Sequence, residues 1–293
     1  MIDWLFLAEV TLAGLGTGAL LALPGVAFVL IYKATKVVNL AIGETLMLGA
    51  YAYFALTSGL GWPLWLAVPL VLAAGGGFGA LVERIMIRPM LGSSAISVFM
   101  VTIGLGAMIV GAVELAWGLE PHRLVTHTSE APLFIGEAYV PRKTAAAFGV
   151  ATLVIVVLLL VLRLWPGSLA LRATATDPGA AYSCGVSVPR VYSFSWAIAS
   201  MIAAGAGILV GAVAGISPGM GVFGLTVLAV VIMGGLDSVL GVLLAALLVG
   251  FAESVVVAYL GGEYKLITTF ALLLLMLLVR PHGLLGTAEI DRL

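Results

Sequence analysis

The chain has few of the charged groups that hold a protein in water. Only 9% of its 293 residues are charged and 62% are hydrophobic, whereas a soluble domain is usually about 25% charged. This shortage excludes a soluble fold, because a chain of this length would have too little polar surface to present to water. The net charge of −1 gives no nucleic-acid-binding signature. The single cysteine, Cys184, excludes an intrachain disulfide.

Motifs for phosphate binding, metal binding and catalysis are also missing. A P-loop needs a glycine–lysine pair before Ser or Thr, and none of the lysines follows a glycine. The histidines are scattered without metal-ligand spacing, and no set of catalytic side chains converges. We therefore expect no cofactor, no metal site and no enzymatic activity in this chain.

Long apolar runs are what the chain has in excess. Each run is about 20 residues long, enough to cross roughly 30 Å of hydrocarbon. We predict an all-α integral membrane protein with one transmembrane domain over residues 1–293, a polytopic bundle of about 8–9 transmembrane helices with short or re-entrant pieces. Glycines between residues 216 and 241 predict a short or re-entrant piece there. The predicted spans are 10–32, 37–56, 63–82, 95–117, 144–164, 192–215, 223–233, 239–260 and 266–279.

The positions of lysine and arginine predict the orientation of these spans, since cytoplasmic loops carry an excess of both. Nine basic residues fall on one side if the N-terminus is outside and the C-terminus is cytoplasmic, and four fall on the other. Residues 118–143 then form an extracytoplasmic loop, and residues 165–190 form a cytoplasmic segment. The predicted cytoplasmic set is Lys33, Lys36, Arg84, Arg88, Arg163, Arg172, Arg190, Arg280 and Arg292; the outer set is Arg123, Arg142, Lys143 and Lys265.

The cytoplasmic segment contains the signals of a short capped helix. Asp177 is suited to the N-cap, and Pro178 to the first helical position, where no N–H donor is needed. Ala180 and Ala181 continue the helix, and Gly185 can adopt the left-handed conformation that ends it. From the residues alone, this segment is either an ordinary ordered loop or a docking element for a cytoplasmic partner.

Two other segments place polar groups where a transport pathway or gate would need them. Glu44, which follows Asn39, lies inside an apolar stretch, where a carboxylate costs about 2.5 kcal/mol or more near the bilayer centre. It therefore faces protein or a water-filled cavity, or it lies near the surface with a hydrogen bond to a neighbour such as Asn39. Ser217, Pro218 and Gly219 make a turn near the outer face, either as part of a gate or as a plain connection.

Two further carboxylates, Glu114 and Glu253, also lie in apolar stretches. Either one is a proton site of an ion-coupled secondary transporter, or it is an interfacial or helix-packing group. An ion-coupled transporter of a small solute that uses Glu44 or Glu253 is therefore the alternative function.

Several motifs follow one another along almost the whole chain. In their number and order they resemble the permeases of the branched-chain amino acid (leucine/isoleucine/valine) family of ABC importers. The motifs that carry the resemblance are Gly14–Leu23, Leu30–Tyr32, Val38–Tyr51, Glu83–Pro89, Thr102–Leu105, Arg172–Pro178, Ala180–Ala181, Gly185–Val186, Ser217–Gly221, Gly234–Leu236, Gly241 and Arg280–Gly286.

The resemblance implies a transmembrane subunit in the inner membrane of a bacterium. Its implied partners are a second, homologous permease, two cytoplasmic ATPases that hold ATP and Mg²⁺, and an extracytoplasmic solute-binding protein. The capped helix would then be the coupling helix that docks on an ATPase. The residues implied in coupling are Arg172, Asp177, Pro178, Gly179, Ala180, Ala181, Cys184, Gly185 and Val186.

The chain departs from the family pattern at three positions. The family often has a phenylalanine and a histidine where this chain has Leu40 and Ile42, and a glutamate where it has Gly179. The resemblance therefore implies import of branched-chain or other hydrophobic amino acids, or of a related small solute. Urea, amides, and aromatic or other carboxylates are the substrate alternatives.

Overall fold

The computed structural model describes residues 4–124, 133–135, 138–164 and 167–287. Within these ranges the chain folds into a bundle of helices with one small hairpin of strands. The helices are α1 (Trp4–Thr35), α2 (Ile42–Phe54), α3 (Leu64–Val82), α4 (Ala95–Trp117), α5 (Arg142–Leu164), α6 (Gly167–Thr176), α7 (Pro178–Ser183), α8 (Val188–Ala214), α9 (Phe223–Gly234), α10 (Val239–Tyr259) and α11 (Lys265–Val279). Short helical turns are η1 (Ala55–Gly59), η2 (Glu83–Ile87), η3 (Arg88–Met90), η4 (Pro218–Val222) and η5 (Gly262–Tyr264).

The predicted all-α membrane fold is confirmed. In the described residues, 7 helices are long and apolar enough to cross a membrane. They are α1, α3 with its two following turns, α4, α5, α8, α10, and α11 with the turn before it. Two shorter segments complete the set that the sequence predicted: α2, which η1 extends, and η4 with α9.

The second predicted span, 37–56, begins later than expected. Lys36 ends α1 in a left-handed conformation with φ of 55°, and its N–H donates to the carbonyl of Tyr32 at 2.8 Å. The chain then runs without helix to Ala41, whose N–H donates to the Asn39 side chain at 3.1 Å. Helix α2 therefore starts at Ile42, because the backbone between the two helices is held by these local hydrogen bonds.

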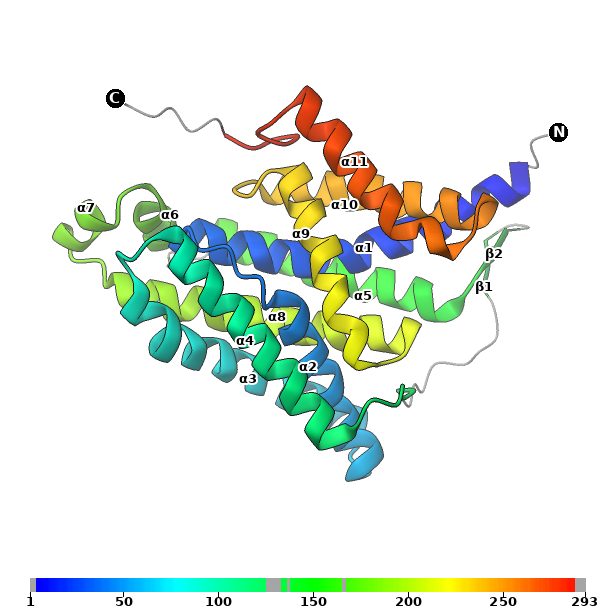
Figure 1. Ribbon diagram of the computed structural model, residues 1–293, viewed down its shortest axis with the longest axis horizontal. Coiled ribbons are helices and arrows are strands. Elements are labelled where there is room, and N and C mark those ends of the chain that lie inside the picture. The colour runs from blue at the N-terminus through cyan, green and yellow to red at the C-terminus, as the bar shows by residue number, and fades with distance from the viewer. Residues whose placement is uncertain (1–3, 125–132, 136–137, 165–166, 288–293) are drawn as a thin grey trace.

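Helix α1 is the centre of the bundle and packs against α10, α8, α5 and α9 (Figure 1). Glycines let the α1 and α10 backbones touch: a Cβ on Gly18 would lie 2.9 Å from the carbonyl oxygen of Ala246. A glycine also allows close backbone contact between α2 and α8, where a Cβ on Gly207 would lie 2.8 Å from the carbonyl carbon of Leu46. Small residues at such crossings are typical of helices that pack in lipid, where close backbone approach replaces the hydrophobic effect.

The two ends of the bundle carry different structures (Figure 1). Helix α6 packs on the bundle at one end and α7 projects beyond it, and the antiparallel hairpin β1 (Leu133–Ile135) and β2 (Ala138–Val140) lies at the other end. At the hairpin end, His122 pairs with Ile216 and the N–H of Tyr139 donates to Glu9 at 2.7 Å. At the α7 end, the segment after α11 returns to α9, as the Leu284 N–H donates to the Met233 carbonyl.

Candidate coupling and translocation sites

Helix α7 forms as the sequence predicted. Asp177 is the N-cap, and its Oδ1 accepts the N–H groups of Gly179 at 2.8 Å and Ala180 at 3.0 Å. Pro178 occupies the first turn, where its missing N–H costs nothing. The Asp177 carboxylate thus accepts two of the N–H groups that have no partner within the helix at its start.

The end of α7 is closed by a Schellman motif. Gly185 has φ of 85°, and its N–H donates to Tyr182, while the N–H of Val186 donates to Ala181. These two bonds satisfy carbonyls that the last turn leaves open. A six-residue helix that is capped at both ends has a fixed shape outside the bundle.

Most side chains of α7 are exposed. Asp177 to Ala180 and Cys184 are exposed, and only Ala181 in the helix is buried. Tyr182 exposes 72% of its surface, although the sequence argument did not select it. An aromatic residue inside a predicted docking helix was the signal that could have found it.

Helix α6 is a further element that the sequence did not predict. It fills the first part of the 165–190 segment and packs on α1, α5 and α8. The Arg172 guanidinium donates back to Ser168, at 3.3 Å to the carbonyl and 3.2 Å to the hydroxyl. Arg172 therefore lies one helix before the capped α7, and the structure shows no contact between its side chain and Asp177.

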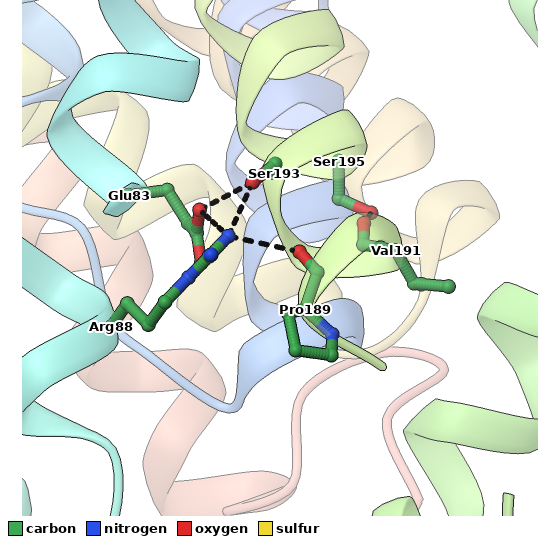
Figure 2. A network of polar contacts seen from close by, with 6 residues as sticks. All are labelled: Glu83, Arg88, Pro189, Val191, Ser193 and Ser195. Carbon is green, nitrogen blue, oxygen red and sulfur yellow. Dashed lines mark hydrogen bonds and ion pairs between the residues drawn. The ribbon is translucent and has the colours of Figure 1, made fainter. Parts of the chain in front are cut away.

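A polar network joins the end of α3 to the start of α8 (Figure 2). The Glu83 side chain is 1% exposed and pairs with Arg88, whose Nη2 lies 2.8 Å from Glu83 Oε2. Nη2 also donates to Ser193 Oγ at 2.7 Å and to the Pro189 carbonyl at 3.2 Å. Ser193 in turn donates to Glu83 at 2.5 Å.

Two members of this network, Pro189 and Ser193, follow the candidate coupling helix α7 closely in the chain. Gly185 and Val186 lead from α7 to α8, and Pro189 stands at the first turn of α8. Arg88 therefore connects the residues that follow α7 to Glu83 in the π-helical turn η2. Such turns are frequent at functional sites. The sequence argument used Glu83 as part of a motif and Arg88 for the motif and the orientation, because nothing in the spacing predicted that α8 would meet them.

The side chain of Glu44, on α2, packs against α4 and η4 at two glycines, whose lack of a side chain leaves room for it. A Cβ on Gly106 of α4 would lie 3.2 Å from the Glu44 carboxyl carbon, and a Cβ on Gly221 of η4 would lie 3.1 Å from its Oε1. Glu44 Oε2 is buried and accepts no hydrogen bond from the residues that the structure describes. The structure thus places Glu44 against protein rather than at an open surface.

The other predicted gate residues divide into two groups. Ser217, Pro218 and Gly219 lead into and begin η4, the turn that contacts α2 and α4 beside Glu44. Asn39 is buried, but its carboxamide holds Ala41 rather than Glu44. The structure therefore brings the 217–219 turn close to Glu44 and leaves Asn39 in the connection before α2.

Glu253 has partners that give it a packing role. It is 1% exposed, accepts a hydrogen bond from Thr269 Oγ1 at 2.5 Å and pairs with Lys265 Nζ at 3.3 Å. Both partners belong to α11, so this carboxylate joins α10 to α11. A buried charge persists when it is paired and hydrogen-bonded in this way.

Comparison with known proteins fixes the family of the chain. Residues 10–277 match the family model described as "Branched-chain amino acid transport system / permease component". The chain belongs to this permease family. The family assignment expected from the motifs is therefore confirmed over nearly the whole chain.

Individual relatives agree with the family. LivH, the high-affinity branched-chain amino acid transport system permease of Escherichia coli K12, is 29% identical over 99% of each chain. BraD, the high-affinity branched-chain amino acid transport system permease of Pseudomonas aeruginosa, is 29% identical over 95% of each chain. The fructose import permease FrcC of Rhizobium meliloti is 29% identical over 74% of this chain and 62% of its own.

A solved structure supports the fold. The structure titled "PsaBC from Streptococcus pneumoniae in complex with Fab" aligns with 92% of this chain and 91% of its own, at a TM-score of 0.51 and 13% identity. At that identity the likeness concerns the arrangement of helices alone. This permease is therefore a multi-pass membrane protein with an arrangement of helices that this solved structure shares.

Proposed function

We propose that this permease is the transmembrane subunit of an ATP-driven importer in a bacterial inner membrane. Helix α7 carries the proposal: it is short, capped at both ends by Asp177 and Gly185, and lies outside the bundle. Membrane insertion requires no such helix, whereas docking on a cytoplasmic ATPase requires a fixed projecting shape. ATP and Mg²⁺ would bind the ATPase subunits, because the sequence of this chain contains no P-loop motif.

In this proposal, α7 and the first turn of α8 transmit the state of the ATPases to the bundle. Only residues 184–187 separate the two helices, so a displacement of α7 reaches Pro189 directly. The Glu83–Arg88 pair then carries it from α8 to α3. Two rigid states of this contact would bias the bundle between inward-open and outward-open forms.

Glu44 and the 217–219 turn are the proposed pathway and gate residues. Glu44 has a buried oxygen with no donor from the described residues, and η4 lies beside it. A carboxylate in this position inside a membrane domain indicates a functional path, because otherwise its desolvation would be uncompensated. The residues proposed to line or gate the path remain Asn39, Glu44, Ser217, Pro218 and Gly219.

The proposed solutes are branched-chain or other hydrophobic amino acids. LivH and BraD are named for branched-chain amino acids, and both match nearly the whole chain. FrcC, which is named for fructose, matches a smaller share. The proposed partners are a second homologous permease, two ATPases and an extracytoplasmic solute-binding protein, and the proposed orientation has the N-terminus outside and α7 in the cytoplasm.

Affinity purification of the chain from its native membrane, followed by mass spectrometry, tests this proposal. We expect two ATPases and a second permease to co-purify, and uptake of leucine by the reconstituted complex to require ATP. Tyr182→Ala should reduce ATPase recovery, whereas Tyr264→Ala, on an exposed tyrosine at the other end of the bundle, should not. Recovery of the chain alone, with uptake driven by an ion gradient, would favour the secondary-transporter alternative.

A further inference from the structure

Three arginines line one cleft between the end of α3 and the start of α8. The cleft measures about 500 Å³, and its basic lining residues are Arg84, Arg88 and Arg190. Arg88 is engaged by Glu83. The side chains of Arg84 and Arg190 are exposed and make no hydrogen bond or ion pair with the described part of the chain. The cleft therefore has an excess of positive charge and two guanidinium groups ready to bind an anion.

The floor of this cleft is apolar and continues onto the sides of the bundle. Ala80, Phe194 and Ala197 line the cleft together with the arginines. On α3 and the turn after it, Leu81 exposes 54% and Ile85 62% of their surfaces. Large exposed apolar side chains on a membrane helix face acyl chains, so the cleft lies where the hydrocarbon layer meets the headgroup layer.

We propose that this cleft binds the headgroup of an anionic phospholipid. The phosphate would accept hydrogen bonds from Arg84 and Arg190, since a planar guanidinium matches phosphate oxygens in pairs. The acyl chains would lie along the apolar sides of α3 and α8 beyond Phe194. Basic pockets between transmembrane helices at the membrane surface are suited to such lipids.

A bound lipid there would contact both helices that the Glu83–Arg88 network joins. Arg84 belongs to the turn after α3 and Arg190 to the first turn of α8. A phosphate that bridges these two residues would hold the ends of α3 and α8 together from outside, next to the internal link through Arg88 and Pro189. The lipid would thus favour the joined arrangement of the two helices.

Native mass spectrometry of the purified complex, extracted from vesicles of phosphatidylethanolamine with phosphatidylglycerol, tests the site. An arginine that contacts an anionic headgroup strengthens binding about fivefold, so Arg84→Gln/Arg190→Gln, which removes both contacts, should retain phosphatidylglycerol about 25-fold more weakly. Arg84→Lys/Arg190→Lys should retain most of it. Lys33→Gln/Arg163→Gln removes the same charge from exposed residues outside the cleft and should bind as the unmodified protein does.

Two results would overturn the proposal. Equal retention by the cleft variant and the unmodified protein, or an equal loss in the control variant, would show that the arginines form no lipid site. Unchanged retention together with a loss of co-purifying ATPase would assign Arg84 and Arg190 to a protein interface instead. Lipid retention is measured without transport, so the result stands whether or not the importer function holds.

Discussion

Arg88→Ala is expected to weaken the junction of α3 with α8 more than any other single change there. Arg88 reaches Glu83 from one side, and Ser193 and the Pro189 carbonyl from the other. Its removal leaves the Glu83 carboxylate, 1% exposed, with Ser193 as its one remaining side-chain donor among the described residues. The internal connection between the residues after α7 and the end of α3 would be lost at the same time.

The size of the effect follows from the burial of the two partners. Breaking a buried ion pair by removing one partner costs about 3–5 kcal/mol, because the other charge stays buried and uncompensated. Arg88 is 35% exposed, so the lower end, about 3 kcal/mol, is expected, a factor of roughly 150 in the folding equilibrium. Glu83→Gln should cost about 1 kcal/mol, since water can solvate the arginine that remains.

A double-mutant cycle measures the pair directly. In thermal unfolding of the purified permease in detergent, the melting temperature of Arg88→Ala should lie well below that of Glu83→Gln, and the double variant Arg88→Ala/Glu83→Gln should recover part of the loss. In the reconstituted complex, the number of ATP molecules hydrolysed per solute imported should rise in Arg88→Ala. A merely structural role would lower the amount of folded protein without changing this ratio.

Two outcomes would refute this reasoning. The first is equal stability of Arg88→Ala and Glu83→Gln, because the calculation depends on the different burial of the two side chains. The second is an unchanged ratio of ATP hydrolysed to solute imported in Arg88→Ala, which would show that the proposed coupling from α7 to the bundle does not pass through this contact.

Three other changes have definite expected results. Glu44→Gln should lower transport by reconstituted vesicles more than Glu114→Gln, because Glu44, unlike Glu114, has a buried oxygen that accepts no hydrogen bond from the described residues; equal activities would argue against a pathway role. Asp177→Ala should remove the α7 N-cap, a loss of about 1 kcal/mol, and reduce ATPase co-purification about fivefold while the thermal stability of the bundle is unchanged. Gly207→Ala should destabilise the α2–α8 crossing by about 1–3 kcal/mol in thermal unfolding, whereas Gly149→Ala, which has open space around it, should not.

The sequence predicted those features that depend on local chemistry or on solvent. Apolar runs of membrane length predict helices, because an unpaired backbone is too costly in hydrocarbon. The caps of α7 could likewise be placed at Asp177 and Gly185, since a cap depends on residues within one helical turn. The late start of α2 was missed, because Lys36 adopts a left-handed conformation that its residue type rarely takes.

Only the tertiary structure decided which polar residues meet. Glu83 and Ser193 are 110 positions apart, and their contact depends on how α3 crosses α8. Glu253 likewise meets Lys265 and Thr269 only because α11 packs beside α10. Composition and periodicity determine that a segment crosses the membrane. They do not determine its neighbours, because an apolar helix face can pack against acyl chains as well as against another helix. The pairing of helices is therefore set by close contacts at glycines and by buried polar groups, and these are properties of the folded bundle.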